Sequence, residues 1–168
     1  MKSTGITRKI DELGRIVIPK EIRRNLGIRD GESLEIYTES DGIILKKHSQ
    51  IEKYEEMGGK LCELISSVFH IDVMITDREK IIAAQDDKMI DKMLSKELLY
   101  LIDNREEWIE QSNIELEDIS LKGYFTVVPI IASIDSLGLI IIRADSAKDY
   151  RDLAKLMAKI ISEKVNIY

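Results

Sequence analysis

The chain has 168 residues, of which 44% are hydrophobic and 33% charged, a composition typical of a folded globular protein and not of a disordered one. Its single cysteine, Cys62, excludes an intramolecular disulfide and a zinc site built from several cysteines, and it indicates a reducing compartment. The net charge of −6, taken alone, argues against nucleic acid as a partner.

The first 48 residues predict short strands around one small helix. Pro19 stands where a helix can begin, Gly27 where it can end in a left-handed conformation, and Asp41-Gly42 is a hairpin signal. In chain order we expect strands over 4–10 and 15–18, a helix over 20–26, and paired strands over 33–39 and 43–47. A unit of this size buries too little apolar surface to fold alone without a disulfide or a metal. We therefore expect an obligate dimer that interlocks through these strands.

A short polar break at residues 48–50 predicts a domain boundary, with one domain over 1–48 and a second over 51–168. In the second domain the spacing of apolar residues alternates between stretches typical of helices and stretches typical of strands. Residues 103–121 are expected to be irregular and to be held to the core by Trp108. The expected elements are helices over 51–69, 89–102 and 147–165, and strands over 72–76, 81–84, 125–133 and 137–143. This order predicts an antiparallel sheet with helices packed on it, and the chain as a whole is predicted to be α+β.

Two positions in the second domain leave alternatives open. Gly58-Gly59 interrupts an apolar helical stripe, and either a close approach of the helix to its neighbour or a bend would explain it. Pro129 cannot donate to a strand ladder, so its strand is expected to run along an edge or to carry a bulge there.

The net charge is an average over unlike segments. Residues 1–29 hold eight Lys or Arg and three acids, a net of +5, whereas residues 30–48 have a net of −3 and the remaining 120 residues a net of −8. A compact basic cluster on an acidic protein keeps a local positive field and suppresses general attraction to polyanions. A solvated charged surface is the alternative.

The N-terminal segment carries a family resemblance. Residues 3–28 are STGITRKIDELGRIVIPKEIRRNLGI, and LEIY at 34–37 and ILKK at 44–47 follow. These residues closely resemble the AbrB-type swapped-hairpin DNA-binding domain, over about residues 1–48. The length and element order of 51–168 resemble family members whose second half is a small GAF domain. The resemblance implies a homodimeric transition-state or sporulation regulator in which strands from two chains form one DNA-binding unit.

The resemblance also implies which side chains contact DNA. The matching arginines are Arg8, Arg15, Arg23 and Arg24, with Lys9 and Lys20 as neighbours. On the expected helix Lys20 lies three and four residues before the paired arginines, so these bases share the outer side, while Ile22 and Leu26 would face the core. Strand alternation places Arg8 on the same face as Ile6 and Ile10, so its outward role comes from the resemblance alone.

Other patterns favour binding over catalysis. Cys62 lies on an apolar helical stripe without a histidine partner nearby in sequence, and we interpret it as a buried structural thiol in preference to a redox or nucleophilic group. No glycine-rich phosphate loop, His-Glu-x-x-His or Gly-x-Ser-x-Gly motif is present, so we expect no enzyme activity, no cofactor and no metal. An apolar set is expected either to line a small-molecule pocket or to fill the core: Met74, Thr76, Ala83, Trp108, Tyr124, Phe125 and Val127.

We therefore predict a DNA-binding transcriptional regulator, activator or repressor, whose second domain modulates it by ligand sensing or oligomerisation. Its expected partners are double-stranded DNA, a second chain joined through the N-terminal domain, further copies joined as a tetramer through helices 51–69 and 147–165, and an unidentified small molecule. The longest apolar runs are six residues, against roughly 20 for a membrane span, so we expect a cytoplasmic, nucleoid-associated protein. Two alternatives are a small-molecule sensor whose N-terminal unit serves only for assembly, and an antitoxin-like DNA-binding protein.

Overall fold

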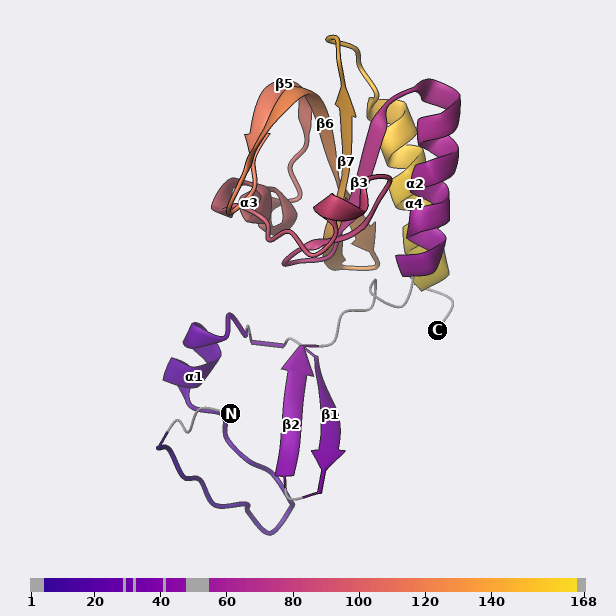
Figure 1. The fold of residues 1–168 in the computed structure, drawn as a ribbon. Coiled ribbons are helices and arrows are strands. Elements are labelled where there is room, and N and C mark those ends of the chain that lie inside the picture. Colours follow the sequence, from indigo (N-terminus) through magenta and orange to yellow (C-terminus); the bar gives the residue numbers. More distant parts are fainter. Residues whose placement is uncertain (1–4, 29, 32, 41, 48–54, 166–168) are drawn as a thin grey trace. The chain divides into compact units, whose positions relative to one another are not determined.

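The computed structural model describes residues 5–28, 30–31, 33–40, 42–47 and 55–165 (Figure 1). The chain forms two compact units, residues 1–48 and residues 49–168. The predicted boundary at 48–50 lies outside the described residues, as does the beginning of the predicted helix over 51–69.

The first unit contains one helix and one strand pair, close to where the sequence predicts them. Helix α1 (Lys20–Asn25) has Pro19 as its N-cap, and Gly27 takes a φ of +63° just beyond its end. Strands β1 (Leu34–Glu39) and β2 (Gly42–Lys47) pair antiparallel, with Tyr37 opposite Ile44. The predicted helix and hairpin are confirmed.

The two further strands predicted in this unit are wrong for the single chain. Among the described residues, 5–10 and 15–18 belong to no strand, although the turn between them forms, with the Asp11 N–H donating to the Arg15 carbonyl at 3.1 Å. A strand forms only where another strand completes its ladder of backbone hydrogen bonds. The large apolar side chains of this unit that stay exposed, among the described residues, are those of Ile6, Ile10, Leu13, Ile16, Val17, Leu26, Ile36, Tyr37, Ile43 and Leu45.

The second unit is built on a five-stranded antiparallel sheet with the strand order β4-β3-β7-β6-β5. Its strands are β3 (Asp72–Thr76), β4 (Ile81–Ala84), β5 (Trp108–Glu115), β6 (Ser120–Ala132) and β7 (Asp135–Ala144). β3 and β4 coincide with the predicted strands, β7 contains the one predicted over 137–143, and β6 contains all but the last residue of the one predicted over 125–133. The predicted antiparallel sheet with packed helices is confirmed.

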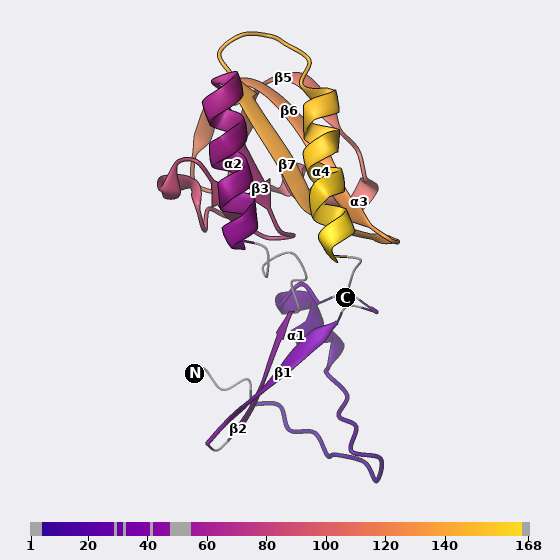
Figure 2. The same cartoon turned by 90° about the vertical axis from the view of Figure 1, so that its right-hand side faces the viewer.

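Helices cover both faces of this sheet (Figures 1 and 2). Helices α2 (Glu55–Phe69) and α4 (Arg151–Val165) lie on one face, and α3 (Lys96–Asn104) lies on the other. Strand β7 shows why: Ile140 and Ile142 enter the core beneath α2 and α4, while Leu139 and Ile141 enter the core beneath α3. A strand covered on both faces is apolar at consecutive positions, as the sequence of β7 is.

Two predictions in the second unit are wrong in part. The predicted helix over 89–102 is a 3₁₀ turn, η2 (Asp87–Met89), then an extended segment, then α3, whose N-cap Ser95 accepts a hydrogen bond from the Leu98 N–H at 3.4 Å. The region 103–121, predicted to be irregular, contains β5, because β6 offers it a pairing edge that the polar sequence of β5 does not reveal. Trp108 does pack against the core, as predicted.

The inward face of helix α2 includes only part of the predicted apolar stripe, of which Met57, Leu61 and Ile65 are partly buried against the core. Gly58, Cys62 and Ser66 are its buried residues, whereas Leu64 and Val68 are each 61% exposed. A Cβ atom on Gly58 would lie 3.2 Å from the Ala83 side chain, while one on Gly59 would meet nothing within 4 Å. Close approach of the helix to the sheet therefore accounts for the first glycine of the pair.

Pro129 lies in the part of β6 that extends beyond β5. The pairing of β6 with β5 ends at Val127, which is opposite Trp108, whereas the pairing with β7 continues past Pro129. Beyond Val127, β6 is locally an edge strand, so the missing N–H of Pro129 interrupts no ladder on that side. The edge alternative is thereby confirmed locally, and the bulge alternative is met beside it, where the register of β6 with β7 shifts between Ile130 and Ile131.

Candidate nucleic-acid interface

Helix α1 carries three of the six predicted DNA-contacting residues. Lys20 and Arg24 are exposed, and their spacing of four residues places them on the same side of the helix. Arg23 is half-buried, and its guanidinium donates a hydrogen bond to the carboxylate of Asp30, a side chain that is 91% exposed. Ile22 is half-buried and Leu26 is exposed, so the inward side of α1 is only partly covered by its own chain.

Arg15 is held by the turn that precedes it. The Asp11 carboxylate accepts the Arg15 backbone N–H and its Nε–H, both at 2.8 Å, and it accepts the Leu13 N–H at 3.0 Å. The backbone and side-chain hydrogen bonds from Arg15 lower the pKa of Asp11. Both side chains are exposed, so the pair orients Arg15 without burying it.

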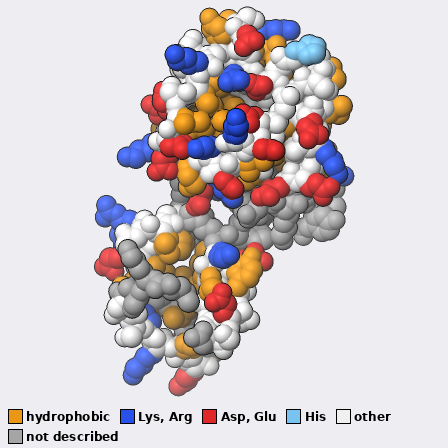
Figure 3. Space-filling view, in the orientation of Figure 1, with side chains coloured by type: hydrophobic (Ala, Val, Ile, Leu, Met, Phe, Trp, Pro, Cys, Tyr) orange, Lys and Arg blue, Asp and Glu red, His pale blue; other side chains and the backbone are white. Residues whose placement is uncertain are grey.

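Arg8 and Lys9 lie before this turn, in the segment that forms no strand. Both are exposed, and the Arg8 guanidinium donates to the Thr7 carbonyl at 3.0 Å. Ile6 and Ile10 are exposed as well, so strand alternation does not assign Arg8 to an inner face in the single chain. In Figure 3, basic side chains of the first unit lie beside exposed apolar ones.

The predicted site thus divides into three groups: the bases on α1, Arg15 at the turn, and the two bases before the turn. The residues that sequence reasoning missed are the acids Asp11 and Asp30, each of which holds an arginine. The first has a recognisable signal, because an aspartate followed three residues later by glycine is typical of a turn that accepts backbone N–H groups. The second has none, since Asp30 reaches Arg23 across the chain reversal at Gly27.

Two titratable side chains of the second unit, Cys62 and Asp77, are buried. Cys62 is fully buried, and burial raises the pKa of its thiol to about 12, which confirms the prediction of a structural thiol. Burial also raises the pKa of Asp77, whose carboxylate accepts the backbone N–H groups of Glu79 and Lys80, both at 2.7 Å. No three His, Cys, Asp or Glu of the described ranges are placed to hold a metal ion.

Of the two alternatives for the apolar set, a ligand pocket or core filling, the structure supports core filling. Five of its members are buried: Met74, Thr76, Ala83, Phe125 and Val127. Trp108 packs against the same core, and only Tyr124 is exposed. Within the described parts of the chain, the helices are too short or too polar to cross a membrane.

Two family models match the chain and together cover most of it. "Stage V sporulation protein T C-terminal, transcription factor" matches residues 54–165. "Antidote-toxin recognition MazE, bacterial antitoxin" matches residues 7–53.

Two Bacillus subtilis (strain 168) proteins are similar in sequence. Stage V sporulation protein T is 38% identical over 151 residues, which are 84% of this chain and 84% of that protein. Transition state regulatory protein AbrB is 65% identical over 48 residues, 29% of this chain and 50% of that protein. The resemblance of the N-terminal segment to the AbrB-type family is confirmed.

Solved structures match the second unit at low sequence identity. Residues 122 to 287 of a methyl-accepting chemotaxis protein align over 71% of this chain and 96% of that chain, with 15% identity and a TM-score of 0.50. A GAF domain from Acinetobacter phosphoenolpyruvate-protein phosphotransferase aligns over 70% of this chain and 86% of that chain, with 8% identity and a TM-score of 0.49. The predicted α+β class, with an antiparallel sheet and packed helices in the second unit, is confirmed.

Proposed function

This chain belongs to the stage V sporulation protein T family of transcription factors, and from that premise we propose how its two units divide the work of a DNA-binding regulator of sporulation or transition-state genes. Residues 1–48 bind double-stranded DNA, and residues 51–168 modulate that binding. The protein acts in the cytoplasm on the nucleoid, as activator, repressor or both, and it catalyses no reaction.

One observation carries the DNA-binding role: the basic residues are concentrated in the first unit of an otherwise acidic chain, and the structure exposes most of them. Residues 1–29 have a net charge of +5, and Arg8, Lys9, Lys20 and Arg24 are exposed. Arginine suits this task because its planar fork donates two hydrogen bonds at once to a phosphate or to a guanine edge. A unit that served only for assembly would gain nothing from this charge.

The first unit acts as a homodimer in this proposal. Helix α1 has no buried residue, and several large apolar side chains of the unit are exposed, among them Ile16, Val17 and Ile36. Segments 5–10 and 15–18, which form no strand in the single chain, would pair with their counterparts in a second copy. The dimer then supplies both the missing ladder and the missing core.

The second unit has its own exposed apolar surface for further assembly. Leu64 and Val68 on α2 and Leu156 on α4 are each more than half exposed. Packing these helices against another copy would join two N-terminal dimers into a tetramer if the two interfaces engage different chains. Oligomerisation and ligand sensing are the two routes by which this unit would alter DNA binding.

The test measures binding of the full chain to a mixed pool of duplex DNA as a function of salt. Eight arginines per dimer on phosphates would give a slope of log affinity against log salt of about −7. Arg23→Ala with Arg24→Ala removes four charges per dimer, so the slope should flatten by about 4 and affinity at moderate salt should vanish. The matched control, Lys88→Ala with Lys122→Ala, removes the same charge from exposed positions of the second unit and should leave both quantities unchanged. Retained affinity in the arginine variant, with its circular dichroism unchanged, contradicts the proposed site.

An antitoxin role is the second candidate, because the MazE antitoxin model matches residues 7–53. Residues 55–165 form a folded unit with a sheet covered on both faces, whereas a disordered C-terminal arm that wraps a toxin is the arrangement which that role calls for. The folded second unit therefore favours the regulator.

A further inference from the structure

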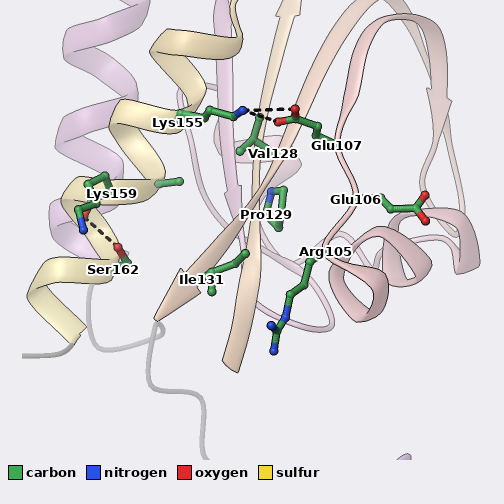
Figure 4. A pocket seen from close by; sticks show the side chains of 10 residues that line it. Arg105, Glu106, Glu107, Val128, Pro129, Ile131, Lys155, Lys159 and Ser162 are labelled. Carbon is green, nitrogen blue, oxygen red and sulfur yellow. Dashed lines mark hydrogen bonds and ion pairs between the residues drawn. The ribbon is translucent and has the colours of Figure 1, made fainter. Parts of the chain in front are cut away.

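A groove in the second unit lies between α4 and the connection from α3 to β5 (Figure 4). It exists because β6 extends beyond the end of β5, so Pro129 and Ile131 have no strand beside them on that side. In Figure 4 the Lys155 ammonium is joined to Glu107, and the Arg105 guanidinium lies apart from that pair. These polar side chains indicate no particular ligand, and a sharper arrangement lies in the first unit.

That arrangement is the turn over residues 11–15, where the two oxygens of the Asp11 carboxylate have different partners. Oδ1 accepts two backbone N–H groups, from Leu13 at 3.0 Å and from Arg15 at 2.8 Å. Oδ2 accepts the side-chain Nε–H of Arg15, also at 2.8 Å. The backbone closes the turn as well, since the Gly14 N–H donates to the Asp11 carbonyl at 2.9 Å. The turn therefore depends on Oδ1 and the backbone, and Oδ2 serves to fix the guanidinium.

The contact at Nε leaves the outer end of the Arg15 guanidinium available. This side chain is 71% exposed, and among the described residues no group accepts a hydrogen bond from its two terminal nitrogens. Four of the five N–H groups of an arginine side chain lie on those nitrogens. Arg23 differs, because the Asp30 carboxylate accepts from one of its terminal nitrogens, Nη1. Asp11 thus presents Arg15 end-on, whereas Asp30 occupies part of the fork of Arg23.

An end-on guanidinium can donate to two oxygens of a phosphate or to O6 and N7 of a guanine in the major groove. The charge of Asp11 distinguishes these two targets. The hydrogen bonds from Arg15 lower the pKa of Asp11, so the carboxylate is ionised at neutral pH. A negative charge beside the fork repels a phosphate, whereas the edge of a guanine carries no net charge.

We propose that Arg15 reads a guanine in the major groove, and that Asp11 is the positioning residue that presents the guanidinium end-on and disfavours a phosphate contact. The inference rests on the DNA-binding role proposed above and deepens it, because it assigns a base-reading contact to one arginine of each chain. Three arginines per chain then remain for phosphates, so the slope of log affinity against log salt would be about −5 for the dimer.

The test uses a duplex selected from a random pool by the full chain, in which each guanine is replaced in turn by 7-deazaguanine. This base lacks the N7 acceptor, so we expect one guanine in each half-site whose replacement weakens binding about tenfold. Arg15→Lys keeps the charge but has no fork, and the same replacement should not affect its binding. If no guanine responds in the natural chain, or if Arg15→Lys responds equally, the inference is overturned. Failure to bind any duplex would instead refute the proposed DNA-binding function itself.

Asp11→Asn separates the two roles of the carboxylate. Its amide oxygen can still accept the backbone N–H groups of Leu13 and Arg15, whereas its amide nitrogen cannot accept the Nε–H. The effect of 7-deazaguanine should therefore fall from about tenfold to about twofold, while affinity for a duplex of A·T pairs alone should be retained or rise slightly. Glu12→Gln makes the same change of charge at the neighbouring exposed position and should keep the full guanine effect.

Two results with Asp11→Asn would overturn its assignment as a positioning residue. An equal loss of affinity for the selected duplex and the A·T duplex would mean that Asp11 only maintains the turn. An undiminished guanine effect would mean that Arg15 needs no carboxylate to reach the base.

Discussion

The ion pair between Arg23 and Asp30 gives the DNA-binding proposal a sharp test. Asp30 holds the Arg23 guanidinium in the free protein and brings a negative charge to the predicted interface. DNA phosphates would compete with this carboxylate for Arg23 and would be repelled by it. Asp30→Asn removes the charge and keeps a side chain of the same shape, so the variant should bind DNA more tightly than the natural chain.

The magnitude follows from the exposure of the pair. Asp30 is 91% exposed, and an ion pair in such a position contributes about 1 kcal/mol or less. A dimer has two such pairs, so low-salt affinity should rise by up to about thirtyfold. Because the slope of about −7 already counts Arg23 on a phosphate in each chain, Asp30→Asn should raise the affinity and leave the slope of log affinity against log salt nearly unchanged.

Fluorescence anisotropy with a labelled duplex, over a series of salt concentrations, measures both quantities. Asp145→Asn makes the same change of net charge at an exposed position of the second unit, and it should alter neither affinity nor slope beyond a small uniform effect. Unchanged binding by Asp30→Asn would mean that Arg23 does not face the DNA. Weaker binding would mean that Asp30 orients Arg23 for its contact, which would refute the reasoning from competition.

Three further predictions concern the second unit. Gly59→Ala should stabilise it by about 1 kcal/mol and raise Tm by roughly 4 °C, since an added Cβ atom meets nothing there. Gly58→Ala should show no such rise in the same thermal melts, because its Cβ atom would crowd the side chains of Ala83 and Ile75. Burial raises the folded-state pKa of Asp77 above 3.8, so near this pH the folded state binds more protons than the unfolded one, and the stabilisation is lost as pH rises through the folded-state pKa. In urea titrations Asp77→Asn should abolish this loss, so the variant should become more stable relative to the natural chain toward neutral pH. If the stabilities of the two proteins changed in parallel with pH, the prediction would be contradicted. With the pKa of its thiol raised to about 12 and no exposed surface, Cys62 should be alkylated by iodoacetamide only after unfolding, and rapid modification of the native protein would contradict that.

The sequence predicts the elements whose signals are local. Pro19 and Gly27 mark both ends of α1, and the alternation around residue 41 marks the β1–β2 hairpin. Strands β3 and β4 coincide with their predicted residues because consecutive apolar residues between turns have few other solutions.

Elements that depend on a distant partner could not be predicted. The polar sequence of β5 becomes a strand only because β6 lies beside it, and segments 5–10 and 15–18 form no strand because nothing in their own chain completes them. Helix α2 likewise buries Gly58, Cys62 and Ser66 fully and its larger core-facing side chains only in part, since the sheet beneath it lies too close for bulk at Gly58. Helical periodicity identifies a helix, but the space beneath it decides which residues face inward.

The candidate site follows the same division. Charge counting finds the basic segment, because it needs only the sequence, and it correctly anticipates exposed bases at Lys20 and Arg24. It does not find the acidic partners of Arg15 and Arg23. The first pairing depends on the hydrogen-bond geometry of the turn at Asp11, and the second on the change of chain direction at Gly27. It also gives no indication of the groove beside α4, which is a consequence of where β5 ends.

The two units of the chain differ both in net charge and in how much apolar surface they bury. The second unit is acidic and buries two clusters of its own, on opposite faces of its sheet, so its fold needs no other chain. The first unit is basic at its start, and its helix buries nothing. In the proposed dimer, a second chain therefore supplies both the free energy that orders the first unit and the rigidity that holds its arginines against phosphates. Ordering of this unit and DNA affinity must then share one dependence on protein concentration, whereas the second unit should stay folded at dilutions where both are lost.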